Sequence, residues 1–165
     1  MWQGKQQKCG LSRAEARYST PEARLERERI IGPNPWAGGE HNNIGCEFMR
    51  MDSVKLAIAE FEKAVELNPW KAVFKVNLAR AYIRNSDFEK AEQRLSETMK
   101  QEPHSPVGLF AWGLLCEAVG RMEEGIRYYV ECLKYCSEGS IKRQAEENLA
   151  VLRRAKKKKQ DSGQE

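Results

Sequence analysis

An internal repeat of 34 residues constrains this 165-residue chain more than any other feature of its sequence. When segments 38–71, 72–105 and 106–139 are aligned, one column holds a large residue, the next a small one and a third a large one again. These columns are Ile44, Leu78 and Trp112; Gly45, Ala79 and Gly113; and Phe48, Tyr82 and Cys116. Such a period, with small residues where two helices must approach closely, predicts a solenoid of stacked helix pairs.

The second half of each segment repeats as well. The recurring positions there are Ala57, Ala91 and Gly125; Phe61, Leu95 and Tyr129; and Pro69, Pro103 and Ser137. This pattern resembles the tetratricopeptide repeat (TPR) family. The second segment matches in both halves, whereas the third has Cys116 and Ser137 where the family usually has an aromatic residue and a proline. The resemblance implies an all-α fold, an α-α superhelix of antiparallel helix pairs, over residues 38–139.

The boundaries within and after the repeats are also readable. Asp52 and Ser53 are expected to cap a helix that begins at Val54, which separates the two helices of the first unit. After the third unit, residues 140–159 carry an apolar stripe on one helical face and charge on the other. The stripe consists of Ile141, Ala145, Leu149 and Leu152. A terminal repeat needs such a helix on its outer side, so we expect a C-terminal capping helix, followed by a disordered tail at 160–165.

Residues 1–37 belong to no repeat. Two capping-box patterns occur there, and the second predicts a short helix from about Thr20 to Ile31. A Gly/Pro-rich stretch follows, and Trp36 within it is expected to pack on the first repeat. The alternative is that this whole N-terminal extension is disordered.

Length and composition favour a single small core. Hydrophobic residues make up 41% of the chain and charged residues 32%. No segment approaches the roughly 20 apolar residues that cross a bilayer. The amino terminus has a basic start without an apolar run behind it, so it does not read as a secretory signal. We therefore expect a soluble, cytoplasmic protein.

The positive charge lies at the two ends of the chain. The formal net charge is +4, and residues 153–165 alone carry six basic and two acidic side chains. The basic run at 153–159 could contact nucleic acid, an anionic membrane or an acidic partner. It could equally be a solvated helix end, where lysines complement the macrodipole. No aromatic residue is interleaved there to stack on bases, which favours the solvated end.

The cysteines predict neither a disulfide framework nor a metal site. There are five, an odd number. Cys132 and Cys136 are four residues apart and would share a helical face, but two thiols do not make a zinc site. The histidines, His41 and His104, show no ligand spacing. Cys132 falls in the column of Ala64, which predicts a small buried packing residue. We expect neither a metal nor another cofactor.

The sequence also lacks the motifs of an enzyme. It contains no glycine-rich phosphate loop, no nucleophile elbow and no histidine placed near a cysteine or serine as a triad requires. We expect a protein without catalytic activity.

The resemblance points to a binding groove instead. In the family, the first helix of each repeat lines a concave groove, and the residues two, five, nine and twelve places into the unit usually face it. Here these positions are Gly39, Asn42, Cys46, Met49, Val73, Val76, Arg80, Ile83, Val107, Phe110, Leu114 and Glu117, and Asn77 and Arg84 are added as neighbours. Most are apolar, which predicts a hydrophobic patch that a partner covers.

The expected partner follows from the chemistry of these positions. Arg80 and Arg84 add positive charge at one side of the apolar patch. We therefore expect an adaptor or scaffold that binds an apolar or amphipathic protein segment carrying acidic residues. The alternative function is a structural subunit of a nucleic-acid-containing assembly, anchored by its basic ends. A third possibility is that the groove is covered by self-association or by the chain's own Leu25, Ile30, Ile31 or Trp36.

One subclass of the family has a defined pattern of binding residues, which can be compared with this sequence. TPR domains that grip the carboxyl-terminal peptides of cytosolic heat-shock chaperones use a clamp of lysines, asparagines and an arginine. Asn77 occupies the asparagine position of that clamp in the second repeat. The other clamp positions are Asn42, Cys46, Val107 and Ala111, none of which is a cation. Recognition of chaperone tails by that clamp is therefore not expected.

Overall fold

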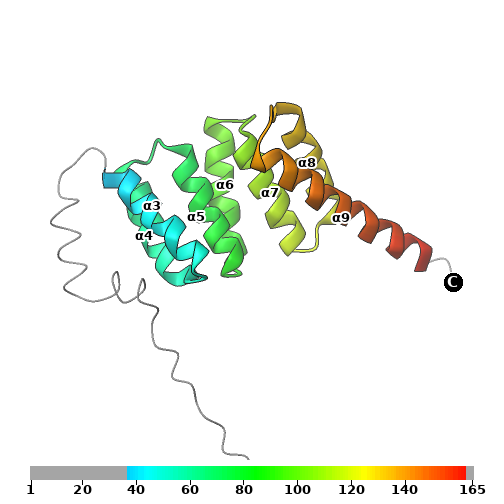
Figure 1. Ribbon diagram of the computed structural model, residues 1–165, viewed down its shortest axis with the longest axis horizontal. Helices are drawn as coiled ribbons and strands as arrows, with labels where there is room; N and C mark the ends of the chain where they lie inside the picture. The colour runs from blue at the N-terminus through cyan, green and yellow to red at the C-terminus, as the bar shows by residue number, and fades with distance from the viewer. Residues whose placement is uncertain (1–36, 163–165) are drawn as a thin grey trace, which may run out of the picture. The chain divides into compact units, whose positions relative to one another are not determined.

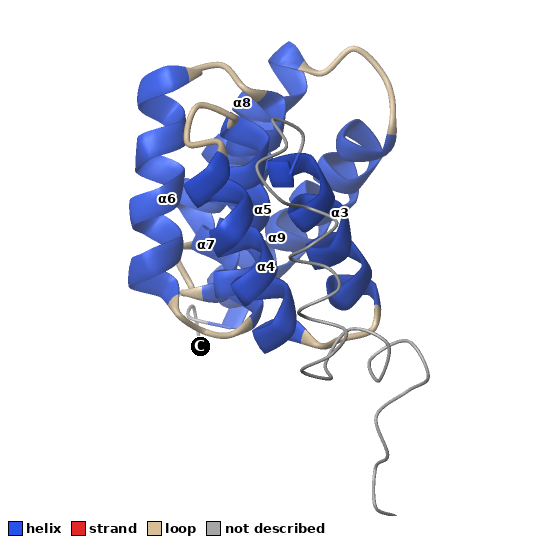
Figure 2. Cartoon of the chain, turned by 90° about the vertical axis from the view of Figure 1, so that its left-hand side faces the viewer, coloured by secondary structure: helices blue, strands red, loops and turns tan. Residues whose placement is uncertain are grey.

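The structure of the protein, a computed structural model, describes residues 37–162, with side chains up to residue 158. The helix predicted from Thr20 to Ile31 and the packing predicted for Trp36 lie outside these residues, as do residues 163–165 of the predicted tail at 160–165. Residues 160–162 belong to the last helix, so the prediction of a disordered tail is wrong for them. Within the described part, every regular element is an α-helix (Figure 1; Figure 2). The all-α prediction is therefore confirmed.

Seven helices follow one another along the described chain. They are α3 (Ala37–Arg50), α4 (Val54–Leu67), α5 (Ala72–Arg84), α6 (Phe88–Gln101), α7 (Pro106–Ala118), α8 (Met122–Tyr135) and α9 (Ser140–Ser162). Helices α3 to α8 form three consecutive pairs, and α9 follows the last pair (Figure 1). None of the described helices combines the length and the apolar character needed to cross a membrane.

Each pair packs internally and against its neighbour. In the first pair, His41 on α3 and Glu60 on α4 are buried and lie 2.7 Å apart, Nδ1 to Oε2. Helix α5 packs on α4, α6 and α7, and α7 packs on α5, α6 and α8. Helix α9 packs on α7 and α8. The first helices of successive pairs are therefore neighbours, as a solenoid requires.

The turn inside each pair has the same backbone conformation. Its tightest residue is in the left-handed region, at Asp52 (φ 59°), Ser86 (φ 64°) and Gly120 (φ 79°), 34 residues apart each time. The next backbone N–H donates to a carbonyl five residues back, for example Ser53 to Phe48 at 2.9 Å. This is the Schellman pattern, which satisfies the last carbonyls of the first helix.

Side-chain capping of the second helices does not occur as predicted. Ser53 is the N-cap residue of α4, but its side chain makes no capping hydrogen bond. Its φ and ψ of −85° and 62° lie outside the extended region that N-cap residues normally occupy. The tight Schellman turn fixes the backbone at this position, so the turn rather than a cap organises the pair.

Small residues lie where the paired helices approach most closely. A Cβ on Gly45 of α3 would come within 2.6 Å of the Phe61 ring on α4. Gly113 of α7 meets the Tyr129 ring on α8 in the same way, and any side chain at Gly113 would collide with that ring. In the first and third pairs, the alternation of small and large columns in the sequence therefore reflects the packing of an aromatic ring against the backbone of the facing helix.

The last pair shares its core with α9. Buried apolar side chains from α7, α8 and α9 form one cluster: Leu109, Phe110, Tyr129, Cys132, Ala145, Leu149 and Leu152. Cys132 is fully buried, its thiol donates to the Pro106 carbonyl at 3.2 Å, and its sulfur lies 3.6 Å from that of Cys136. Burial raises the pKa of the Cys132 thiol to about 12. It is therefore a protonated core residue at neutral pH.

Candidate partner-binding groove

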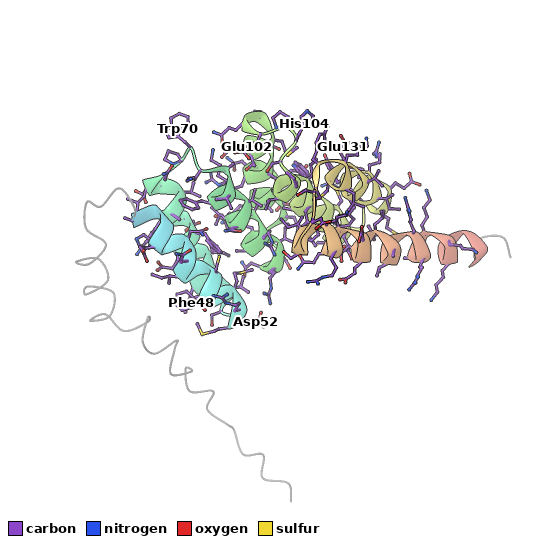
Figure 3. The ribbon with its side chains drawn as sticks, turned by 45° about the horizontal axis from the view of Figure 1, so that its top comes forward. Phe48, Asp52, Trp70, Glu102, His104 and Glu131 are labelled. Atoms are coloured by element: carbon purple, nitrogen blue, oxygen red, sulfur yellow. The ribbon has the colours of Figure 1, made fainter. Side chains whose placement is uncertain are left out.

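The first helices and α9 line an open pocket of about 740 Å³. It lies near the edge formed by the turns within the pairs, where Figure 3 shows Asp52, opposite the edge that carries Trp70 and His104. Its lining residues are Met49, Arg50, Arg80, Ile83, Arg84, Leu114, Glu117, Ala118 and Asn148. We call this the concave pocket.

The repeat register explains why these side chains meet. Three columns of the alignment, each spaced by 34 residues, supply most of the lining. They are Arg80 and Leu114; Met49, Ile83 and Glu117; and Arg50, Arg84 and Ala118. Positions i, i+3 and i+4 share one helical face, so the last turns of α3, α5 and α7 present corresponding faces to one space. The pocket is therefore a direct product of the repeat.

Two of the three arginines at the pocket already have partners. Arg84 donates to the Met49 carbonyl at 3.1 Å and pairs with Asp52. Arg50 pairs with Glu47 in the preceding turn of α3. Arg80, which is solvent-exposed, makes no hydrogen bond or ion pair within residues 37–158. Partial desolvation lowers the pKa of Arg80, and the positive charge of Arg84 lowers it further.

The opposite wall is held by a hydrogen-bonded chain across three helices. The Tyr129 hydroxyl on α8 donates to the Glu117 carboxylate on α7 at 3.0 Å. Asn148 on α9 donates from Nδ2 to the same hydroxyl at 3.1 Å. Burial, the largest influence, raises the pKa of Tyr129, so the ring stays neutral and keeps donating. Glu117 and Asn148 are therefore fixed in orientation at the pocket wall.

A second cluster of predicted groove residues lies further along the first helices. Asn77 on α5 donates to the Asn42 side chain on α3 at 2.8 Å, and its Nδ2 is 3.9 Å from the Cys46 sulfur. Burial raises the pKa of the Cys46 thiol, and nearby Arg50 and Arg80 only partly oppose this. The Asn77 side chain therefore links α3 and α5, and its amide group is already hydrogen-bonded within the protein. Ala111, at another chaperone-clamp position, is fully buried.

Two of the predicted groove residues are not at the surface. Val76 is 1% exposed and Phe110 is 4% exposed. Phe110 lies in the core cluster with Tyr129, whose ring centre is 5.7 Å away, and with α9 residues such as Ala145. The predicted continuous apolar patch is therefore wrong at these positions, because neighbouring helices cover them. Val73 remains exposed and Val107 half-buried, but neither lines the concave pocket.

Three lining residues were not predicted. Arg50 and Ala118 fall in the column of Arg84, so extending the register by one column would have found both. Asn148 belongs to α9, which has no place in the repeat, and no sequence pattern pointed to it. The structure groups no three histidine, cysteine, aspartate or glutamate side chains as a metal site within the described residues.

Comparison with known proteins agrees with this architecture. The family model described as tetratricopeptide repeat matches residues 49–108. No curated protein is similar to the chain by sequence search. The match to the family model and the repeated helix pairs confirm the resemblance seen in the sequence, with residues 49–108 matching tetratricopeptide repeats.

Solved structures share the same fold. The first TPR of Spaghetti (RPAP3), bound to the HSP90 peptide SRMEEVD, has a TM-score of 0.63 at 19% identity, covering 74% of this chain and 94% of that one. The first TPR domain of human RPAP3 gives 0.67 at 20%, covering 78% and 99%. The Sgt2 TPR domain of Aspergillus fumigatus gives 0.67 at 18%, covering 82% and 87%. At these identities the similarity establishes the TPR solenoid fold.

Proposed function

We propose that the protein is a non-enzymatic adaptor that binds a segment of a partner protein in the concave pocket, and that this segment carries an acidic side chain beside apolar ones. Arg80 is the observation that carries the proposal. Arg80 lines the pocket without a hydrogen-bond or ion-pair partner among residues 37–158, while Met49, Ile83 and Leu114 supply apolar surface around it. A carboxylate would complete charge-assisted hydrogen bonds there.

The similarity to peptide-binding TPR domains supports the mode of binding but not the same ligand. The Spaghetti domain holds the peptide SRMEEVD. In this chain, the positions that would form a carboxylate clamp are neutral, and Asn77 is engaged by Asn42. Arg80 and Arg84 lie at other positions of the second repeat. We therefore expect the acidic group of the ligand to contact α5 near Arg80.

Fluorescence anisotropy with two labelled peptides tests the proposal. One peptide alternates leucine with glutamate, and its counterpart has glutamine in place of every glutamate. The protein should bind the glutamate peptide more tightly. Arg80→Gln should reduce the affinity for the glutamate peptide by about 10-fold or more, as expected when a hydrogen bond to a charged group is lost. The affinity for the glutamine peptide should not change.

Lys55→Gln is the matched control, since it removes one exposed cation from α4, outside the concave pocket. It should not alter either affinity by more than about 2-fold. Equal affinity for the two peptides, equal loss in both variants, or no saturable binding of either peptide would each contradict the proposal. The SRMEEVD peptide serves as a further probe and should bind more weakly than the glutamate peptide.

A further inference from the structure

The C-terminal part of α9 presents a basic surface that the concave pocket does not use. Helix α9 continues beyond the end of α8 in Figure 1, and its known neighbours are α7 and α8. Four exposed cations lie on its last described turns: Arg153, Arg154, Lys157 and Lys158. We call them the basic face of α9.

Helix geometry places these four side chains together and away from the solenoid. Positions i, i+1, i+4 and i+5 fall within about 140° of a helix surface, at 3.6 residues per turn. The apolar residues Ala145, Leu149 and Leu152 point the other way, and all three are buried in the core with α7 and α8. The basic face is therefore held outward by the same packing that fixes α9.

Three of the four charges on this face have no partner within residues 37–158. Lys156, on the flank, pairs with Glu123 at 2.7 Å. By contrast, Arg153, Arg154 and Lys157 form no hydrogen bond or ion pair with any residue between 37 and 158. Glu146 and Glu147 occupy earlier turns, so the excess positive charge is confined to the end of the helix.

We propose that the basic face of α9 binds the phosphate backbone of a nucleic acid. The helix rises about 7.5 Å from Arg153 to Lys158, a length over which the two strands of duplex DNA together present about four phosphates. Beside this face lies one exposed apolar side chain, Val151, and the four positions of the face itself carry only cations, whereas protein interfaces depend on several apolar or aromatic anchors. A row of cations on a rigid helix fits a regular row of phosphates.

The same geometry argues against a membrane as the ligand. A helix that lies on a bilayer buries an apolar face among the lipid chains. In α9 that face is occupied by α7 and α8, because Leu149 is only 7% exposed and Leu152 only 4%. What remains for a ligand is electrostatic attraction, which contacts to phosphates alone can supply without sequence specificity.

Anisotropy of a labelled 20-base-pair duplex, measured with the full chain across a salt series, tests this inference. With about four phosphate contacts, the affinity should fall about 100-fold between 50 and 200 mM salt. A variant that replaces all four cations of the basic face by glutamine should lose at least 10-fold in affinity at 50 mM salt and most of the salt dependence. Glutamine keeps the helix propensity close to that of arginine and lysine, and circular dichroism checks that the fold is retained.

The matched control removes the same charge elsewhere, at Lys55, Lys71, Lys90 and Lys100, all of them exposed. The affinity of this control variant for the duplex should stay within about 3-fold of that of the unchanged protein, because local phosphate contacts and not net charge produce the binding. Equal loss in both variants would overturn the inference, and so would unchanged duplex binding in the basic-face variant. Binding to phosphatidylserine vesicles but not to the duplex would also overturn it.

Discussion

The two halves of the first helices differ in what covers them. In their N-terminal halves, Val76 and Phe110 occupy matching positions and both are buried. In their C-terminal halves, Arg80, Ile83 and Leu114 reach the concave pocket. The family resemblance assigned both halves to one groove. Position in the repeat alone therefore does not decide exposure, since neighbouring helices, among them α9 at Phe110, cover these two positions and leave the C-terminal ones open.

The largest effect should come from the closed half. Phe110→Ala removes a buried ring from the cluster shared by α7, α8 and α9, and should lower the free energy of unfolding by about 3–5 kcal/mol. Denaturant unfolding followed by circular dichroism measures it. Leu114→Ala, in the half-buried pocket wall one turn further on, should cost clearly less. Comparable losses in the two variants would show that the two halves are equally packed.

In the open half, the largest effect should be on binding. Arg80→Gln should reduce affinity for the glutamate peptide by about 1.5 kcal/mol or more and change unfolding by less than about 0.5 kcal/mol. Titration calorimetry and thermal unfolding separate these two quantities. If Arg80→Gln lowered the free energy of unfolding by as much as it lowered the free energy of binding, Arg80 would be a structural residue and not a binding residue.

A pair of valines on α5 sharpens the comparison within one helix. Val76→Ala leaves a cavity in the core and should cost roughly 1.5–3 kcal/mol. Val73 is 44% exposed, and Val73→Ala should cost no more than about 0.5 kcal/mol. Both deletions remove the same two methyl groups, so the difference measures burial alone. Equal costs for the two would contradict the packing described for α5.

A change smaller than that of Val76→Ala is expected in the wall contributed by α9. Asn148→Ala removes the donor to the Tyr129 hydroxyl and should cost about 1 kcal/mol, the usual net value of a neutral hydrogen bond. Hydrogen exchange should show faster opening of α9, with α3 to α6 unaffected. If hydrogen exchange in α9 does not change, the buried apolar cluster alone keeps α9 packed on α7 and α8.

Much of the architecture follows from the sequence because a repeat is a local signal. The 34-residue period and the small residues Gly45 and Gly113 each reflect contacts made inside one helix pair. Such contacts involve residues close in sequence, so their spacing is visible without any tertiary information. The apolar stripe of α9 is readable for the same reason.

The site was only partly predictable. Six of the nine residues at the concave pocket, including Arg80 and Glu117, were among the predicted groove positions. Asn148 was not, because α9 lies outside the repeat and reaches the pocket only by packing across α7 and α8. The pairing of Asn77 with Asn42, 35 residues earlier, likewise appears only once α3 and α5 stand side by side.

By itself, the sequence determined the fold class, the repeat and the charges that the molecule carries. Only the tertiary structure decided which of those residues a ligand can reach. Period and composition are properties of the chain, but exposure depends on which helix covers which face. Leu149 and Leu152 are buried while Arg153 and Arg154 beside them stay in water, because one side of α9 meets α7 and α8 and the other meets solvent.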